Sequence, residues 1–186
     1  MKKIFVTAIL LSVLSCPVLS QESNWVAVSH YKAGQEYFNK SEYTKAIGEF
    51  RNALRANPIG LAERAGLINS YLARAAYYHD TEKKYNESLN DLRSALFYIK
   101  LYSDAPMDTQ MQNAASVTER NLAMIMSSLN ISPNPQNRLQ IARKLRLNGN
   151  FAAAATEFYA AAQDKGICSP RAKPSLCIIQ WMRLCC

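Results

Sequence analysis

The small, aromatic and hydrophobic residues between positions 27 and 60 recur every three or four residues, as on one face of a helix. The first set is His30, Ala33, Gly34 and Tyr37. The second set is Tyr43, Ala46, Ile47, Phe50, Ala53 and Leu54. The polar segment 39–41 separates the sets, and Ser41 is predicted to be the N-cap of the second helix because its hydroxyl can accept a backbone hydrogen bond. Residues 27–60 therefore predict a pair of helices, closed by Pro58.

The same spacing returns near the C-terminus. Residues 135–166 repeat it with Ala142, Leu145, Gly149, Phe151, Ala154, Phe158 and Ala161. Residues 61–106 follow it loosely and predict two longer helices, from about 61 to 79 and from about 85 to 103, joined by a polar link. A further helix is predicted at 108–129, before the proline-rich segment 132–135. No segment has the alternation of a strand.

Seven positions in the first pair resemble the signature of the tetratricopeptide repeat, whose period is about 34 residues. They are Gly34, Tyr37, Tyr43, Ala46, Phe50, Ala53 and Pro58. The resemblance implies an all-α, right-handed solenoid of helical hairpins with about seven helices after a signal peptide. It covers a domain at 24–166: strong units at 27–60 and 135–166, a degenerate unit at 61–106, and an irregular helix at 108–129 that is an insert or half a degenerate repeat. His30 and Arg138 stand where the family often has tryptophan, so His30 is expected to be a core histidine.

In such a solenoid the first helix of each pair lines a concave groove. By the resemblance, the residues that face it include Tyr31, Gln35, Phe38, Asn39, Ser70, Tyr77, Leu139, Arg143 and Arg146. Rings supply contact area and arginines supply directed hydrogen bonds, a combination that suits an extended peptide or a helix. An equal alternative is that Tyr31 or Phe38 packs against a neighbouring helix. Tyr31 and Gln35 occupy the places of the lysine and asparagine that grip a terminal carboxylate in some members, so that mode of binding is not expected.

The N-terminal segment 1–20 has the order of a secretory signal peptide. Two lysines precede an apolar run over 4–14, and the small residue Ser20 follows. The run is shorter than the roughly 20 apolar residues that span a bilayer. Cleavage after Ser20 would release a soluble chain, whereas a lipobox-like sequence at 13–16 would make Cys16 a lipid-modified N-terminus. We therefore expect an exported protein, periplasmic or secreted, or a lipoprotein anchored to the membrane through Cys16.

The chain is basic, with a formal net charge of +8. Removal of Lys2 and Lys3 leaves 20 basic and 14 acidic residues, a net charge of +6. The basic residues are scattered, and an exported protein is not expected to bind nucleic acid. An anionic membrane surface or an acidic protein would suit a basic exterior, although ordinary solubilising charge is the simpler explanation.

The segment 167–186 is apolar and rich in cysteine. Cys168, Cys177, Cys185 and Cys186 predict disulfides in an exported chain. A bond between the two neighbouring terminal cysteines would be strained, which leaves Cys168 and Cys177 each joined to one of them. Zinc is an alternative, although the spacing is unusual for it, and a terminal cysteine could also link two chains. The segment is a short packed helix, an exposed interaction surface, or the start of a further repeat.

Catalytic chemistry has little support in the sequence. The chain has two histidines, and His79 stands beside Asp80 and Glu82 at a predicted helix end, where polar residues commonly serve solvation and capping. Nucleophile, zinc-peptidase and phosphate-loop motifs are lacking. We expect no enzyme, cofactor or metal, but an adaptor of the cell envelope that holds a partner protein or peptide in its groove. The alternative is a structural protein that self-associates through its C-terminal segment.

Overall fold

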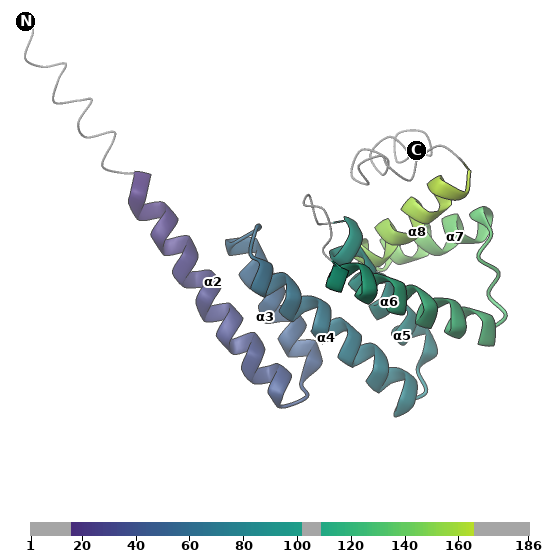
Figure 1. Ribbon diagram of the computed structural model, residues 1–186, viewed down its shortest axis with the longest axis horizontal. Coiled ribbons are helices and arrows are strands. Elements are labelled where there is room, and N and C mark those ends of the chain that lie inside the picture. Colours follow the sequence, from purple (N-terminus) through teal and green to yellow (C-terminus); the bar gives the residue numbers. More distant parts are fainter. Residues whose placement is uncertain (1–15, 102–108, 166–186) are drawn as a thin grey trace, which may run out of the picture. The chain divides into compact units, whose positions relative to one another are not determined.

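The computed structural model describes residues 16–101 and 109–165, and all regular secondary structure in these residues is helical. The helices are α2 (Cys16–Asn39), α3 (Tyr43–Ala56), α4 (Leu61–Asp80), α5 (Tyr85–Leu96), the π-helical turn η1 (Phe97–Leu101), α6 (Thr109–Ser128), α7 (Pro135–Leu147) and α8 (Phe151–Asp164) (Figure 1). The expected all-α class is confirmed for this part of the chain, as are seven α-helices. None of these helices is both long and apolar enough to cross a bilayer.

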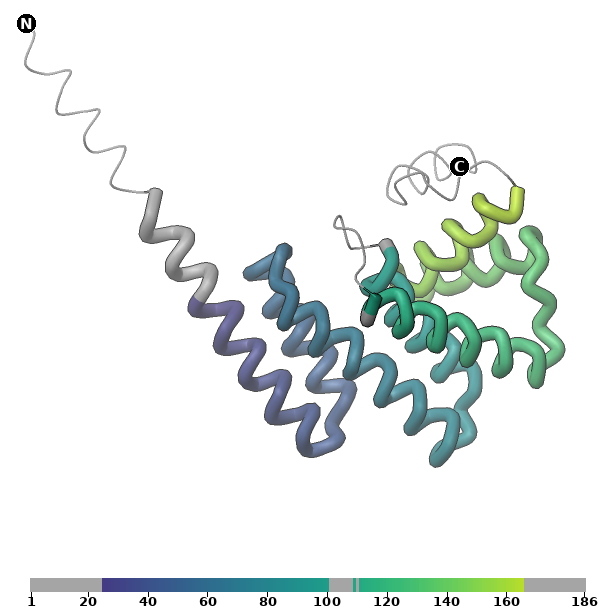
Figure 2. Tube along the Cα trace, viewed as in Figure 1, coloured from purple at the N-terminus to yellow at the C-terminus, as the bar shows by residue number. Residues whose placement is uncertain are grey.

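The chain divides into two compact units, and the division falls within α4. Unit 1 is residues 1–70 and contains α2, α3 and the first half of α4. Unit 2 is residues 71–186 and contains the second half of α4 and the remaining helices. Within unit 1, α2 and α3 lie side by side and run in opposite directions (Figures 1 and 2).

The core of unit 1 is built around the ring of Phe50 on α3, which is 2% exposed. A Cβ atom added to Gly34 on α2 would lie 2.9 Å from this ring, and one added to Gly66 on α4 would lie 2.5 Å from it. Both distances are too short for a methyl group, so the two glycines allow α2 and α4 to approach the same ring. Five of the six residues predicted on this face of α3 are buried, and the sixth, Tyr43, is half-buried: the five are Ala46, Ile47, Phe50, Ala53 and Leu54.

Two local predictions in unit 1 are wrong. Ser41 is not the N-cap of α3, because the helix begins at Tyr43 after a Glu42 that makes no side-chain capping bond. Ser41 instead has a φ of 60° and belongs to the turn, where its N–H donates to the carbonyl of Phe38. His30 is not a core residue: its side chain is 36% exposed, and its Nδ1 lies 2.6 Å from Oε2 of Glu49. A polar pair therefore links α2 to α3 where a core histidine was expected.

Unit 2 contains two hydrophobic clusters, one built on α4, α5 and α6 and the other on α7 and α8. A buried ionic network joins α5, α7 and α8. The Glu157 carboxylate, 1% exposed, accepts from Arg93 Nε at 2.5 Å and from Arg138 Nη1 at 3.1 Å. Thr156 Oγ1 donates to the carbonyl of Arg93 at 2.8 Å. Because both carboxylate oxygens have a guanidinium donor, the charge of Glu157 is compensated.

A second ion pair joins α4 to α5 within unit 2. Arg74 donates through Nε and Nη2 to the two carboxylate oxygens of Asp91, at 2.8 and 2.7 Å. Burial raises the pKa of Asp91 above its ordinary value, and the hydrogen bond and positive charge of Arg74 oppose that shift. Ser88 on α5 also donates to the carbonyl of Ala75 at 2.8 Å. These contacts, together with the hydrophobic cluster, join α4 and α5 as a helix pair.

Candidate functional site

A cavity of about 240 Å³ lies between α2 and α4 in unit 1, and we name it the α2–α4 groove. Its lining is Tyr31, Gln35, Phe38 and Asn39 on α2, Phe50 on α3, and Ala62, Ala65, Gly66 and Asn69 on α4. The structure thus brings together four residues of α2 that the sequence analysis placed in a groove. The α4 side consists of small residues and one amide, which leaves room beside the larger side chains of α2.

Two aromatic residues of α2, Tyr31 and Phe38, line the groove and also contact aromatic rings of α3. The ring centroid of Tyr31 lies 5.7 Å from that of Phe50, and the centroid of Phe38 lies 5.6 Å from that of Tyr43. Tyr31 and Phe38 are half-buried. The two alternatives raised by the sequence therefore coexist, because each ring packs against α3 and also lines the groove. Packing of this kind fixes the rings before any ligand arrives, which lowers the entropy cost of binding.

Three carboxamides line the groove: Gln35, Asn39 and Asn69. All three are exposed, and Gln35 Nε2 donates to the hydroxyl of Tyr31 at 3.0 Å. A carboxamide offers a donor and an acceptor, which is the complement of a peptide group. Among the described residues that line the groove, none is charged. Its chemistry is therefore that of neutral hydrogen bonding beside aromatic surface.

One predicted groove residue of unit 1 is misplaced. Ser70 is fully buried, and its hydroxyl donates to the carbonyl of Gly66 at 2.8 Å. Its neighbour Asn69 lines the groove instead, on the same side as Ala62, Ala65 and Gly66. A helix turns by about 100° per residue, so an error of one position carries a side chain from the groove into the core. The degenerate unit offers few signature residues to fix that position. Asn69 could have been found by asking which polar residue lies on the small-residue face of Ala62, Ala65 and Gly66.

The other predicted groove residues belong to unit 2. Tyr77 is 43% exposed on α4, and its ring centroid lies 6.2 Å from that of Tyr78. Leu139 is half-buried and packs on the α7–α8 cluster, while Arg143 and Arg146 are exposed on α7. None of these four lines the α2–α4 groove. The disulfide candidates lie outside the described residues: Cys168, Cys177, Cys185 and Cys186.

A second cavity, of about 510 Å³, lies between α4 and α6 in unit 2 and includes His79 and Asp80 in its lining. His79 Nδ1 lies 2.7 Å from Oδ1 of Asp80. Glu82 pairs with Lys84 at 2.5 Å instead of joining them. Among the residues that the structure describes, no three histidine, cysteine or acidic side chains gather as a metal site would require. His79 and Asp80 are the last two residues of α4, and Glu82 follows them in the loop.

The α2–α4 groove is the cavity that combines four of the predicted residues with packed aromatic rings and exposed carboxamides. Its neutral lining suits recognition of a peptide chain. No protein-family model matches this sequence, and neither the curated proteins nor the solved structures gave a match.

Proposed function

We propose that this protein is a non-enzymatic adaptor that holds an extended segment of a partner protein in the α2–α4 groove. The observation that carries the proposal is the set of three carboxamides beside two fixed aromatic rings in one uncharged groove. Gln35 and Asn39 are four residues apart and so share one face of α2. Asn69 lies on the opposite wall, so amides can hydrogen-bond a peptide backbone from both sides.

The same proposal includes the tetratricopeptide-like solenoid. Its support is the packing of α2, α3 and α4 on Phe50, in which the signature residue Gly34 and the further glycine Gly66 contact one ring. The pairs α2–α3 and α7–α8 each join two helices by a short turn, as a helical-hairpin repeat requires. Residues 27–60 and 135–166 form these pairs.

The proposal includes export of the protein, because residues 1–20 resemble a signal peptide. An exported adaptor would meet its partner in the cell envelope, either as a free protein or anchored through Cys16. Similar tetratricopeptide proteins serve in the assembly of envelope machines, so an envelope protein presenting an exposed, uncharged segment is the partner class that we propose.

The test is photo-crosslinking in the cells that make the protein, with the probe in place of Gln35. The matched control carries the probe in place of Arg51, which is exposed on α3 and outside the groove lining. We expect a discrete adduct from the Gln35 probe alone, which mass spectrometry would identify. Introducing Asn69→Arg on the opposite wall should remove that adduct, because the longer, charged side chain fills the groove.

Equal adducts from both probes, or an adduct that persists with Asn69→Arg, would count against the groove. An adduct whose only protein is a second copy of this chain would favour the self-associating alternative. Trapping of small molecules without any protein adduct would also contradict an adaptor.

A further inference from the structure

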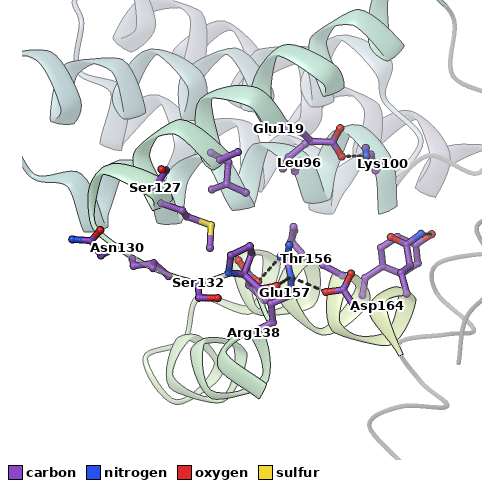
Figure 3. A pocket seen from close by; sticks show the side chains of 18 residues that line it. Leu96, Lys100, Glu119, Ser127, Asn130, Ser132, Arg138, Thr156, Glu157 and Asp164 are labelled. Atoms are coloured by element: carbon purple, nitrogen blue, oxygen red, sulfur yellow. Dashed lines mark hydrogen bonds and ion pairs between the residues drawn. The ribbon is translucent and has the colours of Figure 1, made fainter. Parts of the chain in front are cut away.

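The largest of the three described cavities, about 640 Å³, lies in unit 2 between α6 and α8, and we name it the α6–α8 cavity (Figure 3). Its floor is formed by Leu96, Leu122 and Met126, all of which are buried. Its walls include Ala123 on α6 and Tyr159 and Ala160 on α8. The apolar surface of this cavity is continuous with the α4–α5–α6 core, because the floor residues belong to that hydrophobic cluster.

The charged residues that line the α6–α8 cavity are paired with one another. Lys100 pairs with Glu119 at one side, and at the other Arg138 Nε pairs with Asp164 Oδ2 at 3.1 Å (Figure 3). Glu157 holds two guanidinium groups. A charged small molecule would have to break one of these pairs. With these charges paired, the cavity offers an apolar floor and walls beside neutral polar residues such as Ser127, Asn130 and Ser132, and this lining suits a mainly apolar occupant.

The chain itself leaves α8 at this cavity. Gln163 and Asp164, in the last turn of α8, line it. The segment 166–186 that follows contains no acidic residue and is most apolar over 174–184. Its large apolar side chains are Leu176, Ile178, Ile179, Trp181, Met182 and Leu184. In that stretch Gln180 and Arg183 are the long polar residues, and a spacing of three places them on one face of a helix.

The segment is long enough to reach the whole cavity. The linker from Asp164 to Leu176 can extend to roughly 40 Å at about 3.3–3.6 Å per residue. The 14 residues of α8 span about 21 Å at 1.5 Å per residue. A tethered segment also meets its site at an effective concentration in the millimolar range. The tether therefore favours this segment over any free apolar competitor.

We propose that the α6–α8 cavity is the docking site of the chain's own segment 174–184, bound within the same molecule. In this proposal the large apolar side chains pack against Ala123, Tyr159 and Ala160, which are partly exposed above the buried floor, and the Gln180–Arg183 face turns to solvent. An apolar segment of this length left exposed would be a site of aggregation, and docking removes it from water. The inference does not depend on the α2–α4 groove, which lies in the other unit.

The first test is photo-crosslinking of the purified full chain at high dilution. Benzoylphenylalanine replaces Ala123, which is exposed and lines the cavity, or, as a control on the same helix, Arg120, which is exposed and does not line it. We expect a crosslink of monomer mass from the Ala123 probe to the tryptic peptide 172–183. A crosslink of dimer mass would assign the cavity to a second copy and overturn docking within one molecule. Absence of a tail crosslink, or equal yield from Arg120, would overturn the proposal entirely.

The second test measures the fluorescence emission of Trp181. Trp25, which is 77% exposed, is replaced by phenylalanine so that Trp181 is the sole tryptophan. We expect blue-shifted emission that moves to the red when Ala160→Arg obstructs the cavity, with the helical circular dichroism unchanged. Ala152→Arg, on a half-buried position of α8 outside the cavity, is the control and should leave the emission unchanged. Solvent-exposed emission in the parent protein would overturn the proposal.

Discussion

At the scale of single residues, the ring of Phe50 sets how closely α2 and α4 approach. Gly66→Ala adds a methyl group 2.5–2.8 Å from that ring. We expect a net loss of up to about 2 kcal/mol, because overpacking costs about 1–3 kcal/mol and the gain in helix propensity recovers about 1 kcal/mol. Thermal unfolding followed by circular dichroism measures the loss.

Gly48→Ala is the matched control for that substitution. Gly48 is exposed in the middle of α3, and an added Cβ would have no neighbour within 4 Å. The same chemical change should therefore stabilise the protein by up to about 1 kcal/mol through helix propensity alone. If both alanines stabilised equally, the close approach at Phe50 would not exist.

The buried carboxylate of Glu157 is the residue of unit 2 whose loss should cost most. Glu157→Ala leaves Arg93, which is 4% exposed, without its ionic partner. We expect a loss of about 3–5 kcal/mol, the usual cost of leaving a buried charge uncompensated. Arg138→Ala should cost less, because Arg138 is 20% exposed and Glu157 keeps its bond to Arg93. Urea denaturation compares the two, and a reversed order would contradict the network.

At the scale of elements, the turn between α2 and α3 raises the question whether Ser41 acts as a helix cap or as a turn residue in the left-handed conformation. Ser41 has a φ of 60°. Because the left-handed conformation costs a non-glycine residue about 1–2 kcal/mol, Ser41→Gly should stabilise the folded protein by up to about 1 kcal/mol. Were Ser41 an N-cap, the same change would weaken the protein by a few tenths of a kcal/mol. The sign of the change in urea denaturation therefore decides between the two.

Asn134 is the N-cap of α7 and serves as the comparison for Ser41. Its side chain accepts from the N–H of Asn137 at 2.8 Å, and Pro135 follows it at the first helical position. Asn134→Ala should therefore cost about 0.5–2 kcal/mol, whereas Ser41→Ala should change stability by less than about 0.5 kcal/mol. A cost at Ser41 as large as the cost at Asn134 would restore the capping role of Ser41.

The positions of the helices could be predicted from the sequence far better than the direction in which each side chain points. The helix expected at 108–129 is found at Thr109–Ser128, because apolar spacing and proline both mark it. The error at Ser70 arose because a loosely patterned helix leaves its rotation undetermined by one residue. The ion pairs of Arg74 and Arg93 could not be predicted either. They join residues of different helices, and no local pattern marks which charges will be buried together.

At the scale of the whole molecule, a basic protein carries an uncharged candidate site. The chain has a net charge of +8, yet the residues that the structure describes around the α2–α4 groove are all neutral. Association driven by net charge would weaken steeply with salt, since the screening length falls from about 10 Å at 0.1 M to about 3 Å at 1 M. Contacts between rings, amides and a peptide backbone are screened little by salt.

The adduct formed by the Gln35 probe should therefore keep its yield when purified protein and partner are mixed at 0.1 M and at 0.5 M sodium chloride. Any adduct of the Arg51 control that arises from charge attraction should fall over the same range. Gln35→Ala and Asn39→Ala together remove two of the three groove amides without altering net charge, and they should weaken binding at both salt concentrations alike. A Gln35 adduct that vanished at 0.5 M would mean that the basic exterior, not the neutral groove, holds the partner.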